Sequence, residues 1–275
     1  MQDIGTKNQM RVLLNYHYQY FPYTTASYIE YALQRRKDIS YFRLGEDRLA
    51  CADFYINIEP CEFIARYPGR PSIYWEIDNH IHRGADTAKY GLVDKVYIAQ
   101  NYFKDLYPQE KTEWLPLGAD IERHKRYPEE EQEFDVGFIG NDTYPHRRAL
   151  LEAIGKKYKL LRTSKVYGED YARMLSQCKI IFNCAMDNDI NMRVFEGLAI
   201  GRLLMTDMVQ DQDKLIEDGK HYICYKEEKD LLEKIRYYLD NDTEREAIAK
   251  AGADEVKMFH TYDDRLTVML EGVKK

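Results

Sequence analysis

The chain has 275 residues, a net charge of −7, and a composition that is 44% hydrophobic and 32% charged. This length suits one large domain or two of ordinary size. The acidic balance argues against a protein that wraps bare nucleic acid, because such binding depends on basic surfaces. Five scattered cysteines without a CxxC pair indicate reduced thiols in a cytoplasmic protein. No apolar run approaches the roughly 18 residues that span a membrane, although a peripheral membrane contact stays open.

The first 117 residues alternate β-branched or aromatic runs with amphipathic segments. Such alternation predicts a parallel sheet that helices cover on both faces. The polar segment 118–133, which ends in an acidic run, predicts an interdomain linker. The expected strands are 11–15, 39–44, 52–58, 72–77, 95–99 and 113–117, and the expected helices are 25–35, 85–90 and 102–107.

A second strand–helix series follows over residues 134–259. It predicts a second Rossmann-like domain after the first one at 1–117, and hence an α/β protein. The segment 260–275 carries a helical apolar stripe and is expected to pack back on the first domain. The expected strands are 134–139, 159–161, 179–184, 203–206 and 222–225, and the expected helices are 146–155, 170–177, 191–200, 211–218, 227–239 and 243–258.

The stretch INMRVFEGLAIGRLLMTD, residues 190–207, predicts a helix from about Asn191 followed by a strand. Arg193, Glu196 and Gly197 share one face of that helix by their spacing. An arginine there could meet a bound anion, a glutamate could accept two hydrogen bonds from a diol such as ribose, and the glycine would leave room for a ligand. The same residues also fit a surface ion pair beside a helix glycine, so both interpretations stay open.

This stretch is similar to the nucleotide-binding segment of GT-B glycosyltransferases, especially the CgeB-like (spore maturation protein-like) branch. The segments IYWEIDNHIH, VYIAQNYFKDLY, WLPLGADIERHK and DVGFIGNDTYPHRRALLEAI occur in the order that this branch uses. The resemblance implies a GT-B fold, in which two Rossmann-like domains with parallel sheets face each other across a cleft. It also implies that the C-terminal domain binds most of a nucleotide-diphosphate sugar.

The resemblance further implies which residues contact the donor. Glu196 would bind the ribose and Arg193 the diphosphate, with Asn191 and Gly197 beside them. Many relatives carry an additional acidic residue eight positions before this glutamate, where it touches the sugar. Here that position is Asn188, so the contacts to the donor sugar depart from the family pattern.

The segment FIGNDTYPHRR predicts a second anion site, because a strand, a turn and a helix N-terminus hold phosphates in α/β folds. Arg147 and Arg148 fall in the first turn of the expected helix, and Asn141 lies in the loop before it. The family uses basic residues near this point against the leaving diphosphate, although two solvated arginines are the alternative. Tyr167 precedes another helix, where the resemblance allows it to stack on the base and where it also fits an ordinary loop. Neither GxGxxG nor GxxxxGK[ST] occurs, so a dehydrogenase or P-loop NTPase is not expected.

In EIDNHIH, Asp78, His80 and His82 alternate beyond a predicted strand end, so they would face one side if the chain stays extended. At that edge of the sheet, His80 or Asp78 could orient or deprotonate an acceptor hydroxyl. Capping of the next helix is the structural alternative. Metal binding by His-x-His is disfavoured because no third ligand accompanies it.

Asp187 and Asp189 match the D-x-D spacing of metal-dependent GT-A glycosyltransferases, in which carboxylates hold a divalent cation. A three-residue pattern arises easily in a chain with 47 acidic residues. It also immediately precedes the helix that resembles GT-B enzymes, where no metal is needed. We therefore expect neither a metal nor another cofactor.

Together these features predict a cytoplasmic, metal-independent glycosyltransferase, and the nearest relatives suggest retention of anomeric configuration. The donor would be a nucleotide-diphosphate sugar, with a UDP-sugar favoured, and the acceptor a hydroxyl of a carbohydrate, protein or small molecule. Arg193 would act in catalysis by stabilising the leaving diphosphate. The alternatives are a nucleotide-sugar-binding protein without turnover and a GT-A-type transferase that uses Asp187 and Asp189.

Overall fold

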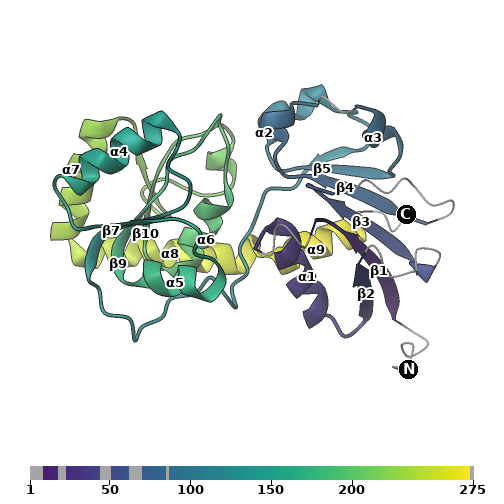
Figure 1. Cartoon of the computed structure of the whole chain (residues 1–275), viewed down its shortest axis with the longest axis horizontal. Coiled ribbons are helices and arrows are strands. Elements are labelled where there is room, and N and C mark those ends of the chain that lie inside the picture. Colours follow the sequence, from purple (N-terminus) through teal and green to yellow (C-terminus); the bar gives the residue numbers. More distant parts are fainter. Residues whose placement is uncertain (1–8, 18–22, 44–50, 62–69, 85–86, 273–275) are drawn as a thin grey trace. The chain divides into compact units, whose positions relative to one another are not determined.

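The computed structural model describes residues 9–17, 23–43, 51–61, 70–84 and 87–272. The chain divides into two compact units (Figure 1). Unit 1 comprises Met1–Leu117 and Tyr262–Lys275, and unit 2 comprises Gly118–Thr261. The segment 118–133, expected as a linker, belongs to unit 2 because several of its side chains, including those of Asp120 and His124, are buried there.

Unit 1 is built on a parallel sheet with the strand order β2-β1-β3-β4-β5-β6. Every residue of β3 and β4 is buried, as expected of central strands in a parallel sheet. The strands are β1 (Met10–Asn15), β2 (Ile39–Arg43), β3 (Phe54–Ile58), β4 (Ser72–Glu76), β5 (Lys95–Ile98) and β6 (Thr112–Trp114). The helices are α1 (Thr25–Arg35), α2 (Asn79–His82), α3 (Thr87–Gly91), the 3₁₀ helix η2 (Asn101–Leu106) and α9 (Tyr262–Glu271).

The last helix, α9, completes unit 1 by packing on α1 (Figure 1). The ring of Tyr262 stacks on that of Tyr28, with centroids 5.3 Å apart. Arg265 is buried and donates hydrogen bonds to the carbonyl oxygens of Pro116 (2.7 Å) and Leu117 (3.0 Å). These contacts join α9 to Pro116 and Leu117, the last two residues of the N-terminal part of unit 1.

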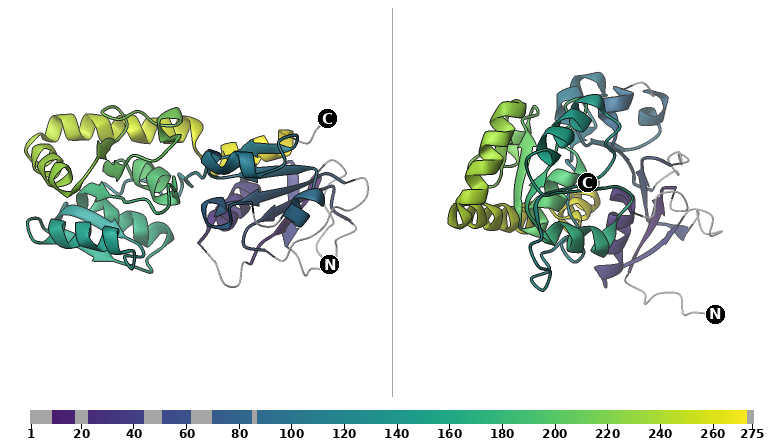
Figure 2. Two further views of the ribbon diagram at one scale, coloured as in Figure 1. Left: turned by 90° about the horizontal axis from the view of Figure 1, so that it is seen from above. Right: turned by 60° about the vertical axis from the view of Figure 1, so that its left-hand side comes forward.

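Unit 2 is built on a second parallel sheet, with the strand order β11-β10-β9-β7-β8. Its helices lie on both faces of the sheet (Figure 2). The strands are β7 (Phe134–Ile139), β8 (Leu160–Thr163), β9 (Cys178–Phe182), β10 (Leu203–Asp207) and β11 (Ile223–Tyr225). The helices are α4 (Pro145–Gly155), α5 (Gly168–Ser176), α6 (Met192–Ile200), the 3₁₀ helix η3 (Gln212–Lys214), α7 (Glu228–Asp240) and α8 (Asp242–Phe259).

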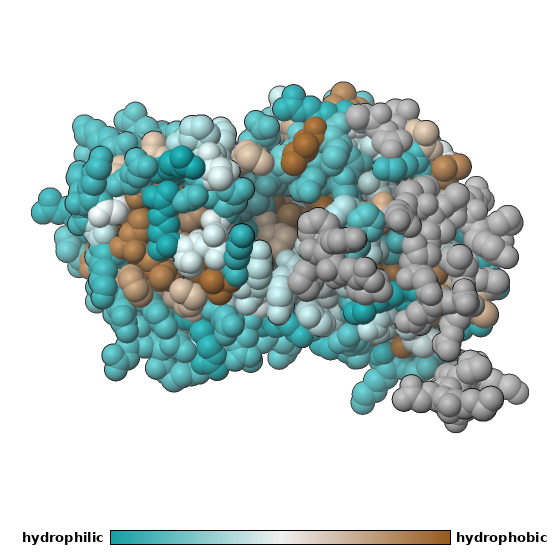
Figure 3. Space-filling model, in the orientation of Figure 1, coloured by the Kyte–Doolittle hydropathy of each residue, from teal (hydrophilic) through white to brown (hydrophobic). Residues whose placement is uncertain are grey.

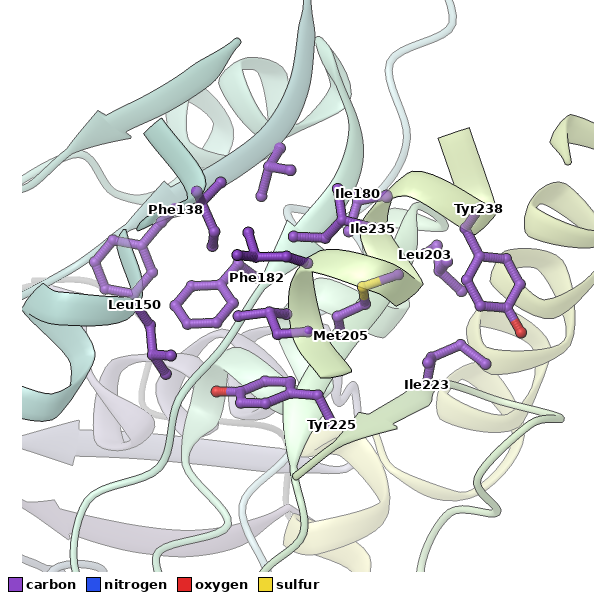
Figure 4. Close-up of a cluster of buried hydrophobic side chains, with 14 of the residues drawn as sticks. Phe138, Leu150, Ile180, Phe182, Leu203, Met205, Ile223, Tyr225, Ile235 and Tyr238 are labelled. Carbon is purple, nitrogen blue, oxygen red and sulfur yellow. The ribbon is translucent and has the colours of Figure 1, made fainter. Parts of the chain in front are cut away.

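Side chains of the unit 2 strands alternate between two faces of the sheet. On one face, the ring of Phe182 lies between those of Phe138 and Tyr225, with centroid separations of 6.0 and 5.7 Å (Figure 4). This face packs against α4 and α7. On the other face, α6 lies close to the strands at Gly197. The sheet therefore has a fully buried core on one side and a closely packed α6 on the other.

Most expected strands and helices occur, with ends shifted by a few residues. The segment 211–218 forms only the short helix η3, which begins after Asp211, a residue in the left-handed conformation (φ 67°). The expected helix 102–107 is the 3₁₀ helix η2. Residues 85 and 86 of the expected helix 85–90 lie outside the described residues.

Hydrophilic residues cover most of the face that Figure 3 shows, in keeping with the 32% of charged residues. Among the described residues, no helix is both long enough and apolar enough to cross a membrane.

The contact between α6 and α8 yields a test of the packing. A Cβ atom at Gly252 of α8 would overlap the carbonyl oxygen of His221 and the side chain of Leu198 on α6. We expect Gly252→Ala to lower the free energy of unfolding by about 1–3 kcal/mol, because overpacking outweighs the higher helix propensity of alanine. Urea denaturation measures the change.

Gly155→Ala, at the end of α4, is the matched control. Its Cβ atom would meet only Leu160, at an ordinary 3.5 Å. That variant should be neutral or slightly stabilised, and equal effects of the two substitutions would contradict a tight contact between α6 and α8.

Candidate functional site

The carboxyl ends of β7 and β9 lead toward two helices that carry charged residues. In open α/β sheets, this edge is where ligands bind. Arg147 lies in the first turn of α4, and Arg193 and Glu196 lie one turn apart on α6. Both guanidinium groups lie over the ring of Phe138, at 5.8 Å for Arg147 and 4.7 Å for Arg193. The fold thus brings together three residues that the sequence predicted for a donor site.

Arg193 is held by groups at the ends of two strands. Its Nε donates to the carbonyl oxygen of Ile139 (3.1 Å), and its Nη1 donates to Oδ1 of Asn183 (2.8 Å). Burial lowers the pKa of Arg193 from its usual value. A Cβ atom on Gly140 would overlap the Nη2 end of this guanidinium. Gly140 therefore leaves the space that Arg193 occupies.

The two adjacent arginines of α4 differ in their surroundings. Arg147 is buried and donates to the carbonyl oxygens of Cys184, at 2.6 Å from Nη2, and Asn141, at 2.6 Å from Nη1. It therefore connects the loops that follow β9 and β7. Arg148 is exposed, and its Nε donates only a long hydrogen bond, 3.3 Å, to the carbonyl oxygen of Asp142. Of the two, Arg147 is the one that adds positive charge next to Arg193.

Glu196 is buried beside a histidine and a tyrosine from two other elements. Nε2 of His124 lies 3.5 Å from Oε1 of Glu196. Tyr171 of α5 meets the histidine ring edge-on, with centroids 6.0 Å apart. Burial, and next the charge of Glu196, raise the pKa of Tyr171 well above its usual value. Its buried hydroxyl has no hydrogen-bond partner among the described residues.

Nothing in the sequence predicts a role for His124 or Tyr171. Both lie far from Glu196 along the chain, and only the fold joins them. The one available signal was that His124 falls within WLPLGADIERHK, a segment that resembles the family.

The remaining predicted donor residues are less closely grouped. Asn191 is the N-cap residue of α6, and its buried Oδ1 has no hydrogen-bond partner among the residues that the structure describes. Oδ1 of Asn188 accepts a hydrogen bond from the backbone N–H of Gln210 (2.8 Å). Asn141 and Tyr167 are exposed in loops, before α4 and at the start of α5 respectively.

Gly197 contributes to packing against the sheet rather than to ligand access. A Cβ atom there would point at the sheet, 3.1 Å from Leu204 and 3.4 Å from Ile181. The missing side chain therefore lets α6 approach β9 and β10, and the expectation that it leaves room for a ligand is wrong. The reason is that this position of the helix faces the side chains of the sheet, with no open space beside it.

The expected extended acceptor segment of unit 1 is also corrected. Residues 79–82 form the helical turn α2, in which the N–H groups of Ile81 and His82 bond to the carbonyl oxygen of Asp78. The side chain of Asn79 fixes this turn through two hydrogen bonds to the backbone of Gln100 (2.8 and 2.9 Å). Alternate residues consequently do not share one side.

The turn separates the two histidines. His80 is buried, whereas the side chain of His82 is 50% exposed and its Nε2 lies 2.8 Å from Oε1 of Glu59. The other oxygen of Glu59 accepts the backbone N–H of Asp78 (3.0 Å). Burial raises the pKa of Glu59 to about 7. The imidazole open to solvent at this edge is therefore His82.

The D-x-D segment forms a tight turn in which Asp187 and Asn188 have positive φ angles of 50° and 63°. The negative charge of Asp189 acts to raise the pKa of Arg193, against the larger effect of burial. Within the described part of the chain, no group of three or more His, Cys, Asp or Glu side chains is placed to hold a metal ion.

Residues 123–271, more than half of the chain, match the model of the glycosyl transferase-like family. The chain belongs to this glycosyltransferase family. A comparison with curated proteins finds no match.

Solved structures show the same fold. HepE from Anabaena, in complex with UDP and glucose, has a TM-score of 0.67 and 11% identity over 96% of this chain and 99% of its own. A glycosyltransferase from Rickettsia africae has a TM-score of 0.61 and 11% identity over 96% of this chain and 97% of its own. TarM has a TM-score of 0.57 and 11% identity over 91% of this chain and 58% of its own. The fold, with two parallel-sheet α/β units, is therefore that of GT-B glycosyltransferases, as predicted.

The contact between Gly140 and Arg193 can be tested by a double-mutant cycle. We expect Gly140→Ala to lower the free energy of unfolding by about 1–3 kcal/mol, because it displaces a guanidinium that makes two hydrogen bonds to the protein. In an Arg193→Met background, the same substitution should cost less, since no guanidinium remains to be displaced. Urea denaturation of the four proteins gives the coupling energy.

Alanine at position 140 also changes the conformational preference of the backbone. This contribution to the free energy of unfolding is the same in the wild-type and the Arg193→Met backgrounds, so it cancels in the coupling energy. A coupling energy of zero would show that the arginine does not depend on the space at Gly140.

Proposed function

We propose that this glycosyltransferase moves a sugar from a nucleotide-diphosphate sugar to an acceptor hydroxyl, with the nucleotide bound by unit 2. One observation carries the proposal: Arg193 and Glu196 lie one turn apart on α6, at the ligand-binding edge of the sheet, with Arg147 next to them. A guanidinium and a carboxylate at this spacing suit a diphosphate and a ribose diol, respectively.

Arg193 is assigned to the diphosphate. Its hydrogen bonds to Ile139 and Asn183 fix the guanidinium and leave N–H groups on Nη1 and Nη2 for an anion. Arg147 contributes a second positive charge, although most of its donors are taken by backbone carbonyls. Fixed positive charge in a partly dehydrated site stabilises the negative charge that develops on a leaving diphosphate.

Glu196 is assigned to the ribose. The buried Oδ1 of Asn191 and the hydroxyl of Tyr171 are polar atoms without hydrogen-bond partners among the described residues, and bound polar groups would satisfy them. UDP is favoured as the nucleotide because HepE was crystallised with UDP-glucose and TarM with UDP. Tyr167 is proposed to stack on the base, and Asn188 to lie near the sugar.

We further propose that the enzyme belongs to the CgeB-like branch, retains anomeric configuration and needs no metal. Two arginines supply positive charge where a GT-A enzyme uses a cation. Unit 1 is proposed to receive the acceptor near Asp78 and His80, where His82 is the exposed imidazole. Arg148 and Asn141, both exposed, are assigned to the rim of the donor site. Five free cysteines support a reducing compartment such as the cytoplasm.

A nucleotide-sugar-binding protein without turnover is the second candidate. It is favoured by Asn188, whose side-chain oxygen is already bonded to the backbone of Gln210, at the position where relatives have an acidic residue. Product formation from a panel of nucleotide sugars separates the two candidates, because a binding protein gives none. Loss of turnover in EDTA that manganese restores would contradict a metal-independent mechanism.

The proposal is tested by thermal unfolding with UDP, GDP, dTDP, CDP and ADP. At 100-fold excess over its Kd, a bound nucleotide should stabilise the native state by about 2.7 kcal/mol, which raises Tm by several degrees. We expect UDP to give the largest shift, and Glu196→Ala and Arg193→Met to abolish most of it.

The matched control is Glu152→Ala, which removes an exposed glutamate from α4 in the same unit. That variant should respond to UDP as the wild type does. The proposal fails if no nucleotide stabilises the protein, or if Glu196→Ala retains the full response.

A further inference from the structure

His124, the buried histidine beside Glu196, has no assigned function in the proposed donor site. His124 comes from the segment before β7, and its side chain is only 1% exposed. Its Nε2 lies 3.5 Å from Oε1 of Glu196, and the ring of Tyr171 packs edge-on against it. Burial of an imidazole removes its hydration, which costs free energy unless both ring nitrogens have polar partners in the protein.

The partner of Nδ1 determines which nitrogen of His124 carries the proton. The backbone N–H of Asp120 donates to Nδ1 at 3.3 Å, so Nδ1 must hold a lone pair. Burial lowers the pKa of His124, which keeps the imidazole neutral near pH 7. The single ring proton is therefore on Nε2, the nitrogen that faces Glu196.

The backbone that holds His124 is itself well fixed. Asp120 is fully buried, and its carboxylate accepts the backbone N–H of Glu122 (3.1 Å) and pairs with Arg123 (3.2 Å). The N–H of His124 also bonds to the carbonyl oxygen of Asp120 at 2.7 Å. This tight turn sets the direction of the imidazole before any ligand binds.

We propose that His124 is a positioning residue that holds Glu196 in the orientation required to bind the ribose. With Nε2 only 3.5 Å from Oε1, the Nε2–H group can occupy one acceptor site of the carboxylate and leave the remaining sites for the two ribose hydroxyls. Fixing the carboxylate in advance reduces the side-chain entropy that is lost on binding. This inference rests on the proposed function, in which Glu196 binds the ribose.

The inference predicts a specific effect on ribose selectivity. A hydroxyl that donates to a carboxylate contributes more than a neutral hydrogen bond, so the wild type should bind UDP about 10- to 100-fold more tightly than 2′-deoxy-UDP. If His124 orients Glu196, this ratio depends on the Nε2–H group. A histidine that only supports the fold would affect both nucleotides equally.

Two substitutions separate these possibilities. His124→Gln places an amide N–H at about the position of Nε2 and can still donate to Glu196. His124→Asn can keep the contact with the backbone of Asp120 but is too short to reach Glu196. Isothermal titration calorimetry with UDP and 2′-deoxy-UDP gives the affinity ratio for each variant, and urea denaturation confirms that each one is folded.

We expect His124→Gln to keep the ratio within about threefold of the wild type and His124→Asn to lower it at least fivefold. An unchanged ratio in His124→Asn, or an equal loss in both variants, would overturn the positioning role. If His124→Asn fails to fold, His124→Leu, which lacks any donor, replaces it and should lose the ratio; if His124→Gln fails to fold, His124→Asn is compared with the wild type alone.

Glu196→Ala makes failure of this inference distinguishable from failure of the proposed function. If Glu196→Ala keeps the wild-type ratio, Glu196 does not bind the ribose and the proposed function is wrong. If Glu196→Ala loses the ratio while His124→Asn retains it, Glu196 binds the ribose without help from His124, and only the positioning role is wrong.

Discussion

The close approach of α6 to the sheet of unit 2 is the constraint on which the candidate site depends. Gly197 lets the helix lie against Ile181 and Leu204, and Gly252 of α8 lets a second helix press on it from behind. A side chain at either glycine would push the layers apart. Because the helix is held on both sides, the direction of its first turn, and hence of Arg193, is fixed by packing rather than by the charges.

The fixed helix places Arg193 next to Arg147 at the strand ends. Partial burial of two guanidinium groups costs hydration free energy unless their N–H groups form hydrogen bonds within the protein. The structure offsets this cost with backbone carbonyls: Ile139 accepts from Arg193, and Cys184 and Asn141 accept from Arg147. The face of Phe138 adds a favourable contact with both guanidinium groups. A chain with net charge −7 can thus hold two neighbouring guanidinium groups, each fixed by hydrogen bonds to the backbone.

The sequence was sufficient for the features that depend on periodicity within one element. The α/β alternation, the helix of Arg193 and Glu196, and its stop at Gly201, which has a left-handed φ of 73°, all follow from local pattern. The function of Gly197 could not be predicted, because a single helix does not reveal which of its faces meets the sheet. The contact of His124 with Glu196 was equally inaccessible, since it depends on a turn and a helix that only the folded unit brings together.

The error in the acceptor segment has a similar cause. Alternation of Asp78, His80 and His82 implies a shared side only if the backbone stays extended. A long-range contact decides otherwise, since Asn79 bonds to the backbone of Gln100 and holds the segment as a helical turn. The turn buries one histidine and pairs the other with Glu59.

The carboxyl ends of the strands in the two sheets carry different sets of charged residues. In unit 2 this edge holds Arg147 and Arg193 together with the carboxylates of Glu196 and Asp207, whereas in unit 1 it holds Glu59 and Glu76, two buried carboxylates at the ends of β3 and β4. Burial raises the pKa of both. Carboxyl groups of this kind can exchange hydrogen bonds with a neutral hydroxyl, whereas they offer no positive charge to a phosphate. This difference supports the proposed division of roles, in which unit 2 binds the diphosphate and unit 1 receives an uncharged acceptor group.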